Sequence, residues 1–218
     1  MFKGVAFDMD GVLLDSEKIY RRFEMEAAAR YGLPLDDFDE FCARIAGGTK
    51  HTNAKVFTDF FGTGIDYMEY REVVNEGVEG FGKEYGYEMK PGVKELFDFL
   101  KERGIKMALT TSTDRDRAER FLEPHGLLPY FDARVFGNMI PAGRGKPNPD
   151  IYLTACRELG LEPSEVIGVE DSRNGVLSSS RGGLYTVMVI DLIQPDDIIR
   201  EHADEIYENI YEISQLFN

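Results

Sequence analysis

Two aspartates, Asp8 and Asp10, stand one residue apart directly after a short apolar run at residues 4–7. In an extended segment, residues i and i+2 project to the same side, so we expect both carboxylates on one face at a strand end. Gly11 behind them allows a sharp backbone turn. Two such close carboxylates call for a compensating cation, and Mg²⁺ held by carboxylates and a substrate phosphate is the economical choice. A solvated loop would carry the same pair, so the rest of the chain must decide.

Further polar residues close other apolar runs along the chain. Thr111 ends the run that begins at residue 105, and Glu170 and Asp171 end the run at 165–169. In open parallel sheets, ligands bind beyond the carboxyl ends of the strands. We therefore expect all these side chains to meet Asp8 and Asp10 at one edge of a sheet.

The elements that must position these residues alternate along the second half of the chain. Apolar runs predict strands at residues 4–7, 105–109, 131–136, 165–169 and 186–190. Helical spacing predicts helices at 92–103, from 114 to about 125, at 150–159 and at 173–181, and a helical tail at 195–218 with a short strand at 205–207. This alternation predicts an α/β fold with a doubly wound, Rossmann-like parallel sheet.

Residues 16–87 follow a different pattern, in which helices succeed one another without a convincing strand. The first helix is expected at about 17–31, with Asp15 or Ser16 as its N-cap. We predict a helical cap domain at 16–87, inserted into a core domain of residues 1–15 and 88–218. The two connections, at 14–16 and 87–91, are the expected hinges.

The composition limits the choice of partner. A net charge of −15 argues against nucleic acid and anionic membranes, and a phosphate ester would need a local positive charge. Cys42 and Cys156 lack metal-like spacing, so we expect two reduced thiols. Residues 1–4 do not resemble a signal peptide, and no apolar run approaches a transmembrane length, so we expect a cytoplasmic protein. No apolar stripe is left over for an interface, and we expect a monomer.

These residues resemble the four motifs of the haloacid dehalogenase superfamily of phosphotransferases. The motifs are the segment 8–12 around Asp8 and Asp10, the hydroxyl of Thr111, Lys146 within the segment 145–150, and the segment 168–172 around Glu170 and Asp171. The resemblance covers nearly the whole chain. The helical insertion after the first motif is similar to the cap of the subgroup that holds β-phosphoglucomutases and small sugar-phosphate phosphatases.

The resemblance implies a role for each motif residue. Asp8 would be the nucleophile that forms an aspartyl phosphate, and Asp10 the general acid and base. Lys146 would supply the local positive charge. Thr111, with the backbone amides of Ser112 and Thr113, would hold the phosphoryl oxygens.

The resemblance also implies Mg²⁺ as cofactor and a small phosphate ester as substrate. The ligands of Mg²⁺ would be the Asp8 carboxylate, the Asp10 backbone carbonyl and Asp171, with Glu170 acting directly or through water. The cap would set specificity, and its candidate substrate contacts are Tyr20, Arg44, Lys50 and His51.

Three functions remain open at this point. The preferred one is a Mg²⁺-dependent phosphatase acting on a small metabolite such as a sugar phosphate. A β-phosphoglucomutase is the alternative, but this chain has Tyr20 and Lys50 where the mutases that it resembles carry a histidine and an arginine. A catalytically silent phosphometabolite-binding module would be expected to have lost Asp8, Asp10, Lys146 or Asp171, and all four are present.

Overall fold

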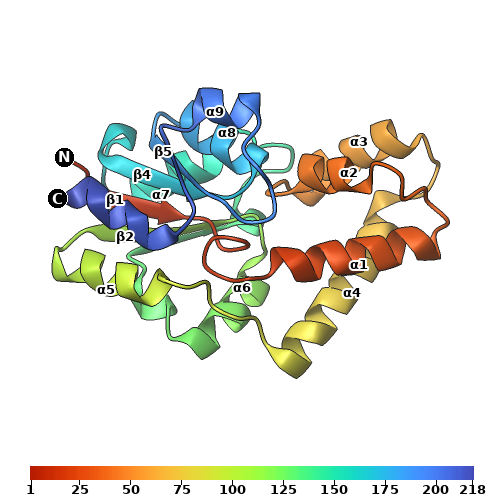
Figure 1. Cartoon of the computed structure of the whole chain (residues 1–218), viewed down its shortest axis with the longest axis horizontal. Helices are drawn as coiled ribbons and strands as arrows, with labels where there is room; N and C mark the ends of the chain where they lie inside the picture. Colours follow the sequence, from red (N-terminus) through yellow and green to blue (C-terminus); the bar gives the residue numbers. More distant parts are fainter.

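The computed structural model describes residues 1–218 and contains one six-stranded sheet in the order β3-β2-β1-β4-β5-β6 (Figure 1). Every neighbouring pair of strands is parallel. The strands are β1 Gly4–Phe7, β2 Lys106–Thr111, β3 Ala133–Phe136, β4 Val166–Glu170, β5 Tyr185–Val189 and β6 Glu205–Tyr207. β1 lies at the centre, between β2 and β4, because the chain winds outward from it in both directions.

Both faces of the sheet are covered, which explains why its central strands are fully buried. Val5 and Phe7 point to one face, into the large cluster that also contains Phe97 of α5. Ala6 points to the other face, where it packs with Tyr152 of α7. The helices around the sheet are α5 Val93–Glu102, α6 Arg115–Leu122, α7 Asp150–Leu159, α8 Arg173–Arg181 and α9 Asp197–His202, and the chain ends in the 3₁₀ helix η5 Ile210–Phe217.

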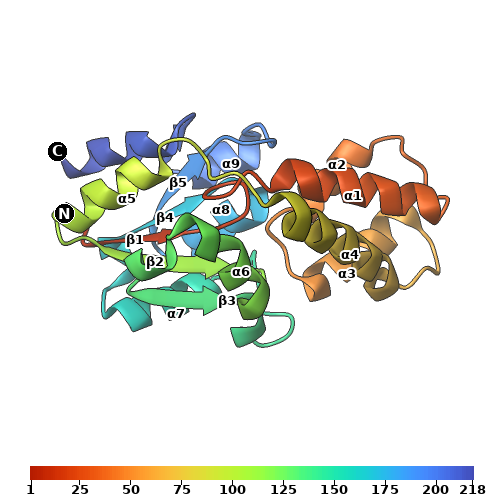
Figure 2. The same ribbon diagram turned by 90° about the horizontal axis from the view of Figure 1, so that it is seen from below.

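Four helices form a separate lobe beyond the carboxyl ends of the strands, as Figures 1 and 2 both show. They are α1 Glu17–Arg30, α2 Phe38–Ile45, α3 Lys50–Phe61 and α4 Tyr67–Tyr85, and we call residues 17–85 the helical lobe. Aromatic rings fill its interior: Phe57 contacts Phe41, Phe61 and Tyr70 at ring-centroid distances of 6.0, 5.2 and 4.8 Å. Aromatic pairs at such distances add specific packing to burial, and these rings belong to, or pack against, the same large apolar cluster as Phe7 of the sheet.

The predicted fold class is confirmed, and each predicted strand is present, including the short one at Glu205–Tyr207. The expected strand at 131–136 is shorter, because residues 128–130 form a 3₁₀ turn and Phe131 follows it directly. The helical part of the predicted tail consists of α9 before β6 and the 3₁₀ helix η5 after it. No helix is long and apolar enough to cross a membrane. The division into a core and a cap domain at residues 16 and 87 stays a prediction.

Candidate active site

The site lies where β1, β2 and β4 end side by side. Phe7 is paired with Leu109 of β2 and with Val169 of β4, so the residues that follow these three positions converge. Asp8, Thr111, Glu170 and Asp171 are all buried there. Gly11 has a positive φ of 76°, and a Cβ at this position would overlap the Asp171 carboxylate. The turn after β1 therefore needs glycine for both its conformation and its close approach to β4.

Lys146 is the cation of the site and is completely buried. Its Nζ lies 2.6 Å from Asp8 Oδ1 and 2.6 Å from Glu170 Oε1, and it donates to the Thr110 carbonyl at 3.0 Å. A buried ammonium is tolerated only with such partners. Burial lowers the pKa of Lys146, but Asp8 and Glu170 more than offset this and hold it above its ordinary value. The lysine is therefore a fixed positive charge beside Asp8.

Glu170 is held by a partner that the sequence motifs do not include. The Tyr152 hydroxyl of α7 donates to Glu170 Oε1 at 2.6 Å. On the other side, a Cβ at Gly175 would overlap the Glu170 carboxylate, so α8 approaches it closely. Nothing in the spacing of Tyr152 marks it in the sequence, because it reaches the site only through the packing of α7 under the sheet.

Three carboxylates form a cluster that could hold a metal ion. One oxygen from each of Asp8, Glu170 and Asp171 lies within 4.8 Å of the other two. Burial raises the pKa of Asp8 to about 8, with Lys146 opposing this and Glu170 and Asp10 adding to it. Burial and the nearby Glu17 likewise raise the pKa of Asp171 well above its usual range. This set of hard oxygen donors fits a divalent cation such as Mg²⁺, which would favour the ionised carboxylates.

Asp10 lies beside this cluster, and both of its carboxylate oxygens accept hydrogen bonds. Ser16 Oγ donates to Oδ1 at 2.7 Å, and Thr113 Oγ1 donates to Oδ2 at 3.0 Å. We expected Asp15 or Ser16 to cap α1. Ser16 is indeed the N-cap residue, but its side chain makes no capping bond, since its hydroxyl is used by Asp10. The side chain of Asp10 is thus oriented from both sides.

The segment after β2 presents hydroxyls and amides toward the same place. Thr111 is fully buried, and its Oγ1 accepts from the Thr113 amide at 3.1 Å. Ser112 Oγ donates to the Gly47 carbonyl of the helical lobe at 2.8 Å. Of the three residues that we expected around the phosphoryl group, Thr113 contacts Asp10, and Ser112 links the sheet to the lobe.

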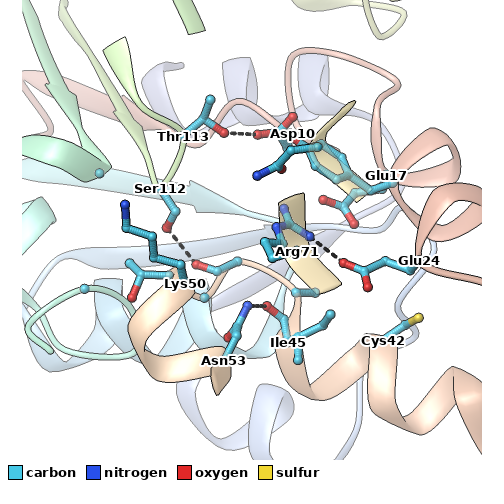
Figure 3. Close-up of a pocket in the computed structure, with 18 of the residues that line it drawn as sticks. Asp10, Glu17, Glu24, Cys42, Ile45, Lys50, Asn53, Arg71, Ser112 and Thr113 are labelled. Atoms are coloured by element: carbon cyan, nitrogen blue, oxygen red, sulfur yellow. Dashed lines mark hydrogen bonds and ion pairs between the residues drawn. The ribbon is translucent and has the colours of Figure 1, made fainter. Parts of the chain in front are cut away.

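A cavity of about 1010 Å³ opens between the sheet and the helical lobe. It is lined by Asp8 and Asp10 from one side and by Tyr20, Lys50 and His51 from the other. Tyr20 is nearly buried, whereas Lys50 and His51 are exposed at the start of α3. Figure 3 shows Lys50 on the side of Ser112.

Arg44, the remaining candidate for substrate contact, does not line this cavity. It pairs instead with Glu40 on the surface of α2, at 2.9 Å. That expectation is therefore not met, because the helical phase of α2 directs Arg44 outward while Ile45 turns inward.

Several charged residues of the cavity were missed by sequence reasoning, among them Glu17, Glu24 and Arg71. Glu17 lines it beside Asp10, and burial together with the charges of Asp10 and Asp8 raises its pKa to about 8. Glu24 and Arg71 form a buried ion pair deeper in the helical lobe (Figure 3). In the sequence, a glutamate and an arginine on amphipathic helices are expected at the surface. Only the packing of α1 on α4 places Glu24 and Arg71 in the cavity.

The sheet, the helical lobe and the buried carboxylates beside Lys146 define an α/β protein with an acidic site that could hold a metal ion. A family model described as haloacid dehalogenase-like hydrolase matches residues 2–183. The chain belongs to this family, as the sequence motifs indicate.

Characterised relatives are similar over most of their length. The chain is 33% identical to the phosphorylated carbohydrates phosphatase of Thermotoga maritima, over 85% of this chain and 83% of that protein. It is 31% identical to the validoxylamine A 7'-phosphate phosphatase of Streptomyces hygroscopicus subsp. limoneus, over 86% and 85%. Among solved structures, a hydrolase from Pseudomonas syringae matches with a TM-score of 0.86 at 22% identity, covering 99% of this chain and 98% of that one. This last likeness shows the fold.

Proposed function

We propose that this protein is a Mg²⁺-dependent phosphatase that hydrolyses a small phosphorylated carbohydrate through an aspartyl phosphate on Asp8. The observation that carries the proposal is the setting of Asp8, which ends the central strand between the buried Lys146 and the carboxylates of β4. A carboxylate held at this junction is oriented for in-line attack on phosphorus, while fixed charges compensate the phosphoryl oxygens.

Each further residue has a role that its contacts support. Asp10, fixed by Ser16 and Thr113, protonates the leaving oxygen and then takes a proton from the attacking water. The Thr111 hydroxyl and the Ser112 amide bind phosphoryl oxygens, and the Thr113 amide, which donates to Thr111 Oγ1, orients that hydroxyl. Mg²⁺, held by Asp8, Asp171 and the Asp10 carbonyl with support from Glu170, would supply the charge that brings two anions together. Positioning and charge stabilisation account for most of catalysis in phosphoryl transfer.

The substrate class follows from the relatives and from the cavity. By name, one of the phosphatases compared above acts on phosphorylated carbohydrates and the other on validoxylamine A 7'-phosphate. The cavity has room for a small metabolite, and the helical lobe would act as the cap that closes over the leaving group and excludes bulk water. We further expect a monomeric, cytoplasmic enzyme without nucleic-acid or membrane partners.

A mutase would have to bind the second phosphate of a bisphosphate intermediate tightly. Lys50 occupies the place of the mutase arginine, and it is exposed and lacks the bidentate fork of a guanidinium. Tyr20 replaces the mutase histidine, and burial raises its pKa to about 12, so it stays a neutral hydroxyl. Both features favour hydrolysis over mutase activity.

The test is phosphate release with Mg²⁺ from a panel of sugar phosphates and other monoesters, with Asp8→Asn as the inactive variant. We expect release from several monoesters and a loss of at least about 10⁴-fold in kcat for the variant. β-Glucose 1-phosphate with a trace of the 1,6-bisphosphate is assayed separately for glucose 6-phosphate. Fast isomerisation with little free phosphate would contradict the proposal in favour of a phosphomutase. No turnover of any ester would favour a silent binding module.

A further inference from the structure

The positive charges that line the cavity are mostly committed to acidic partners. The lining includes five arginines and lysines, namely Arg21, Lys50, Arg71, Arg117 and Arg173. Three of these five form ion pairs with carboxylates that line the same cavity: Arg21 with Asp39, Arg71 with Glu24 and Arg173 with Asp196. A ligand with a second negative charge would therefore find little uncompensated positive charge.

The Glu24–Arg71 pair is the one that lies inside the cavity. Glu24 of α1 is 3% exposed and Arg71 of α4 is 23% exposed, whereas Asp39, the partner of Arg21, is 76% exposed. In Figure 3 the Arg71 guanidinium points toward Glu24, and Glu17 lies on the same side of it. The Tyr70 hydroxyl donates to the Glu24 backbone carbonyl at 2.9 Å and fixes the two helices at this level.

The Glu24–Arg71 ion pair has no net charge, but it still has unused hydrogen-bonding groups. Only Nη1 of Arg71 is used by Glu24, and the second carboxylate oxygen, Oε2, is buried without a partner. Arg71 therefore keeps donors and Glu17 offers acceptors, whereas Glu24 Oε2 is covered by protein. A hydroxyl group, which both donates and accepts, matches such a surface, whereas a carboxylate or phosphate can only accept.

The two remaining cations do not replace Arg71 as an anion site. Arg117 Nη1 donates to Asn75 of α4 at 2.8 Å, and its Nε and Nη2 are covered by protein, with the rings of Tyr20 and Phe121 at 5.5 and 5.7 Å. Lys50 lies exposed on the side of Ser112, away from Glu24 (Figure 3). Arg71 is thus the cation that the far end of a substrate would meet.

We propose that Glu24 determines specificity: by neutralising Arg71 it makes the cavity select phosphate esters with an uncharged, hydroxyl-rich tail and reject those with a second anionic group. This inference rests on the phosphatase function proposed above. A second anion would face Asp10, Glu17 and Glu24. Arg71 is already compensated by Glu24. Arg117 has Nη1 on Asn75 and its other nitrogens covered by protein, so no free guanidinium would offset the desolvation of that anion.

The test compares two esters that differ only at the far end, sorbitol 6-phosphate and gluconate 6-phosphate. They carry a CH₂OH and a carboxylate, respectively. We expect wild type to prefer sorbitol 6-phosphate in kcat/KM. Glu24→Gln keeps the shape and the acceptor for Arg71 but removes the charge, and we expect it to shift the ratio toward gluconate 6-phosphate by at least about tenfold, equivalent to ~1.4 kcal/mol.

Two further variants keep the proposal testable if Glu24→Gln folds poorly. Arg71→Gln removes the cation, so it should shift the ratio the opposite way. The double variant with Gln at both positions is again uncharged, so its ratio should return toward that of wild type. Glu26→Gln is the matched control: it removes the exposed partner of Arg22 on the same helix, α1, lies outside the cavity and should leave the ratio unchanged.

The outcomes separate this inference from the proposed function. Hydrolysis of both esters with equal kcat/KM by wild type, or the same ratio in wild type and Glu24→Gln, would overturn the role of Glu24 and leave the phosphatase intact. Failure of wild type to release phosphate from any ester would overturn the function and the inference together. A similar shift in Glu26→Gln would show a general charge effect and would also overturn the inference.

Discussion

At the level of single residues, the most informative contacts are the two hydroxyls on Asp10. A general acid and base must present one oxygen to the leaving group and later to water, and a freely rotating carboxylate would spend much of its time misdirected. Ser16 and Thr113 come from opposite sides, one from the start of α1 and one from the loop after β2. The first turn of the helical lobe and the sheet therefore share control of this side chain.

We predict that removing these hydroxyls lowers turnover more than substrate binding. Ser16→Ala and Thr113→Val should each reduce kcat about tenfold with a smaller change in KM, because orientation matters most in the transition state. Steady-state kinetics on the best ester measures both constants. Thr58→Ala, which removes an exposed hydroxyl that bonds only within α3, is the control. A rise in KM with an equal fall in kcat/KM and an unchanged kcat would show that the hydroxyls bind substrate instead.

At the level of elements, the first turn of α8 stands out because it approaches β4 so closely. Ser172 caps the helix by accepting from the Gly175 amide at 3.1 Å, and Gly175 packs directly against the Glu170 carboxylate. Glu170 in turn holds Lys146. The packing of this helix therefore sets the position of the cation at Asp8.

We predict opposite effects for two glycine-to-alanine changes in helices. Gly175→Ala must displace Glu170, so it should cost about 1–3 kcal/mol of stability and lower activity. At Gly80 in α4 an added methyl group would meet no atom within 4 Å, so Gly80→Ala should add roughly 0.5–1 kcal/mol by helix propensity and leave kinetics unchanged. Urea unfolding measures both. A stable, fully active Gly175→Ala enzyme would contradict the tight packing against Glu170.

The sequence alone predicts those elements and site residues that depend on a local pattern of apolar and polar residues. Alternating apolar runs and helical spacing predict the sheet, and the side chains after each run predict Asp8, Thr111, Glu170 and Asp171 at one edge. Lys146 is predictable only through its motif, since its loop has no regular pattern. The positions at strand ends can be predicted because the periodicity of the sequence shows where each strand ends.

The sequence is insufficient where contacts join distant elements. Tyr152 meets Glu170 through the packing of α7 beneath the sheet, and Glu24 meets Arg71 through the packing of α1 on α4. Neither pairing follows from local spacing. The direction of Arg44, which turns outward while its neighbour Ile45 is buried, depends in the same way on how α2 sits in the lobe.

At the level of the whole molecule, the acidic groups around the site couple stability to pH and metal. Burial raises the pKa values of Asp8 and Glu17 to about 8 and that of Asp171 well above its usual range, whereas unfolded carboxyl groups titrate near ~4. Because these carboxyl groups bind protons more tightly in the folded than in the unfolded protein, their protonation stabilises the folded metal-free protein. Their contribution is fully present below about pH 4 and is lost as the pH rises through about 8.

We predict from this that Mg²⁺ stabilises the protein more at high pH. The cation binds the ionised carboxylates, so protons compete with it at pH 6 and much less at pH 8.5. At 100 times its Kd, Mg²⁺ should add about 2.7 kcal/mol, or roughly 5–10 °C in Tm, at pH 8.5 and clearly less at pH 6. Thermal unfolding with and without chelator, at matched ionic strength, measures the difference at each pH.

Asp171→Asn provides the control for this last prediction. It removes one carboxylate of the cluster, so the Mg²⁺-dependent rise in Tm should largely disappear at both pH values. The metal-free variant should also lose less stability between pH 6 and 8.5 than wild type, because one group with a raised pKa is gone. A Mg²⁺ effect of equal size at both pH values, or one that persists in Asp171→Asn, would mean that the ion binds elsewhere on this acidic protein.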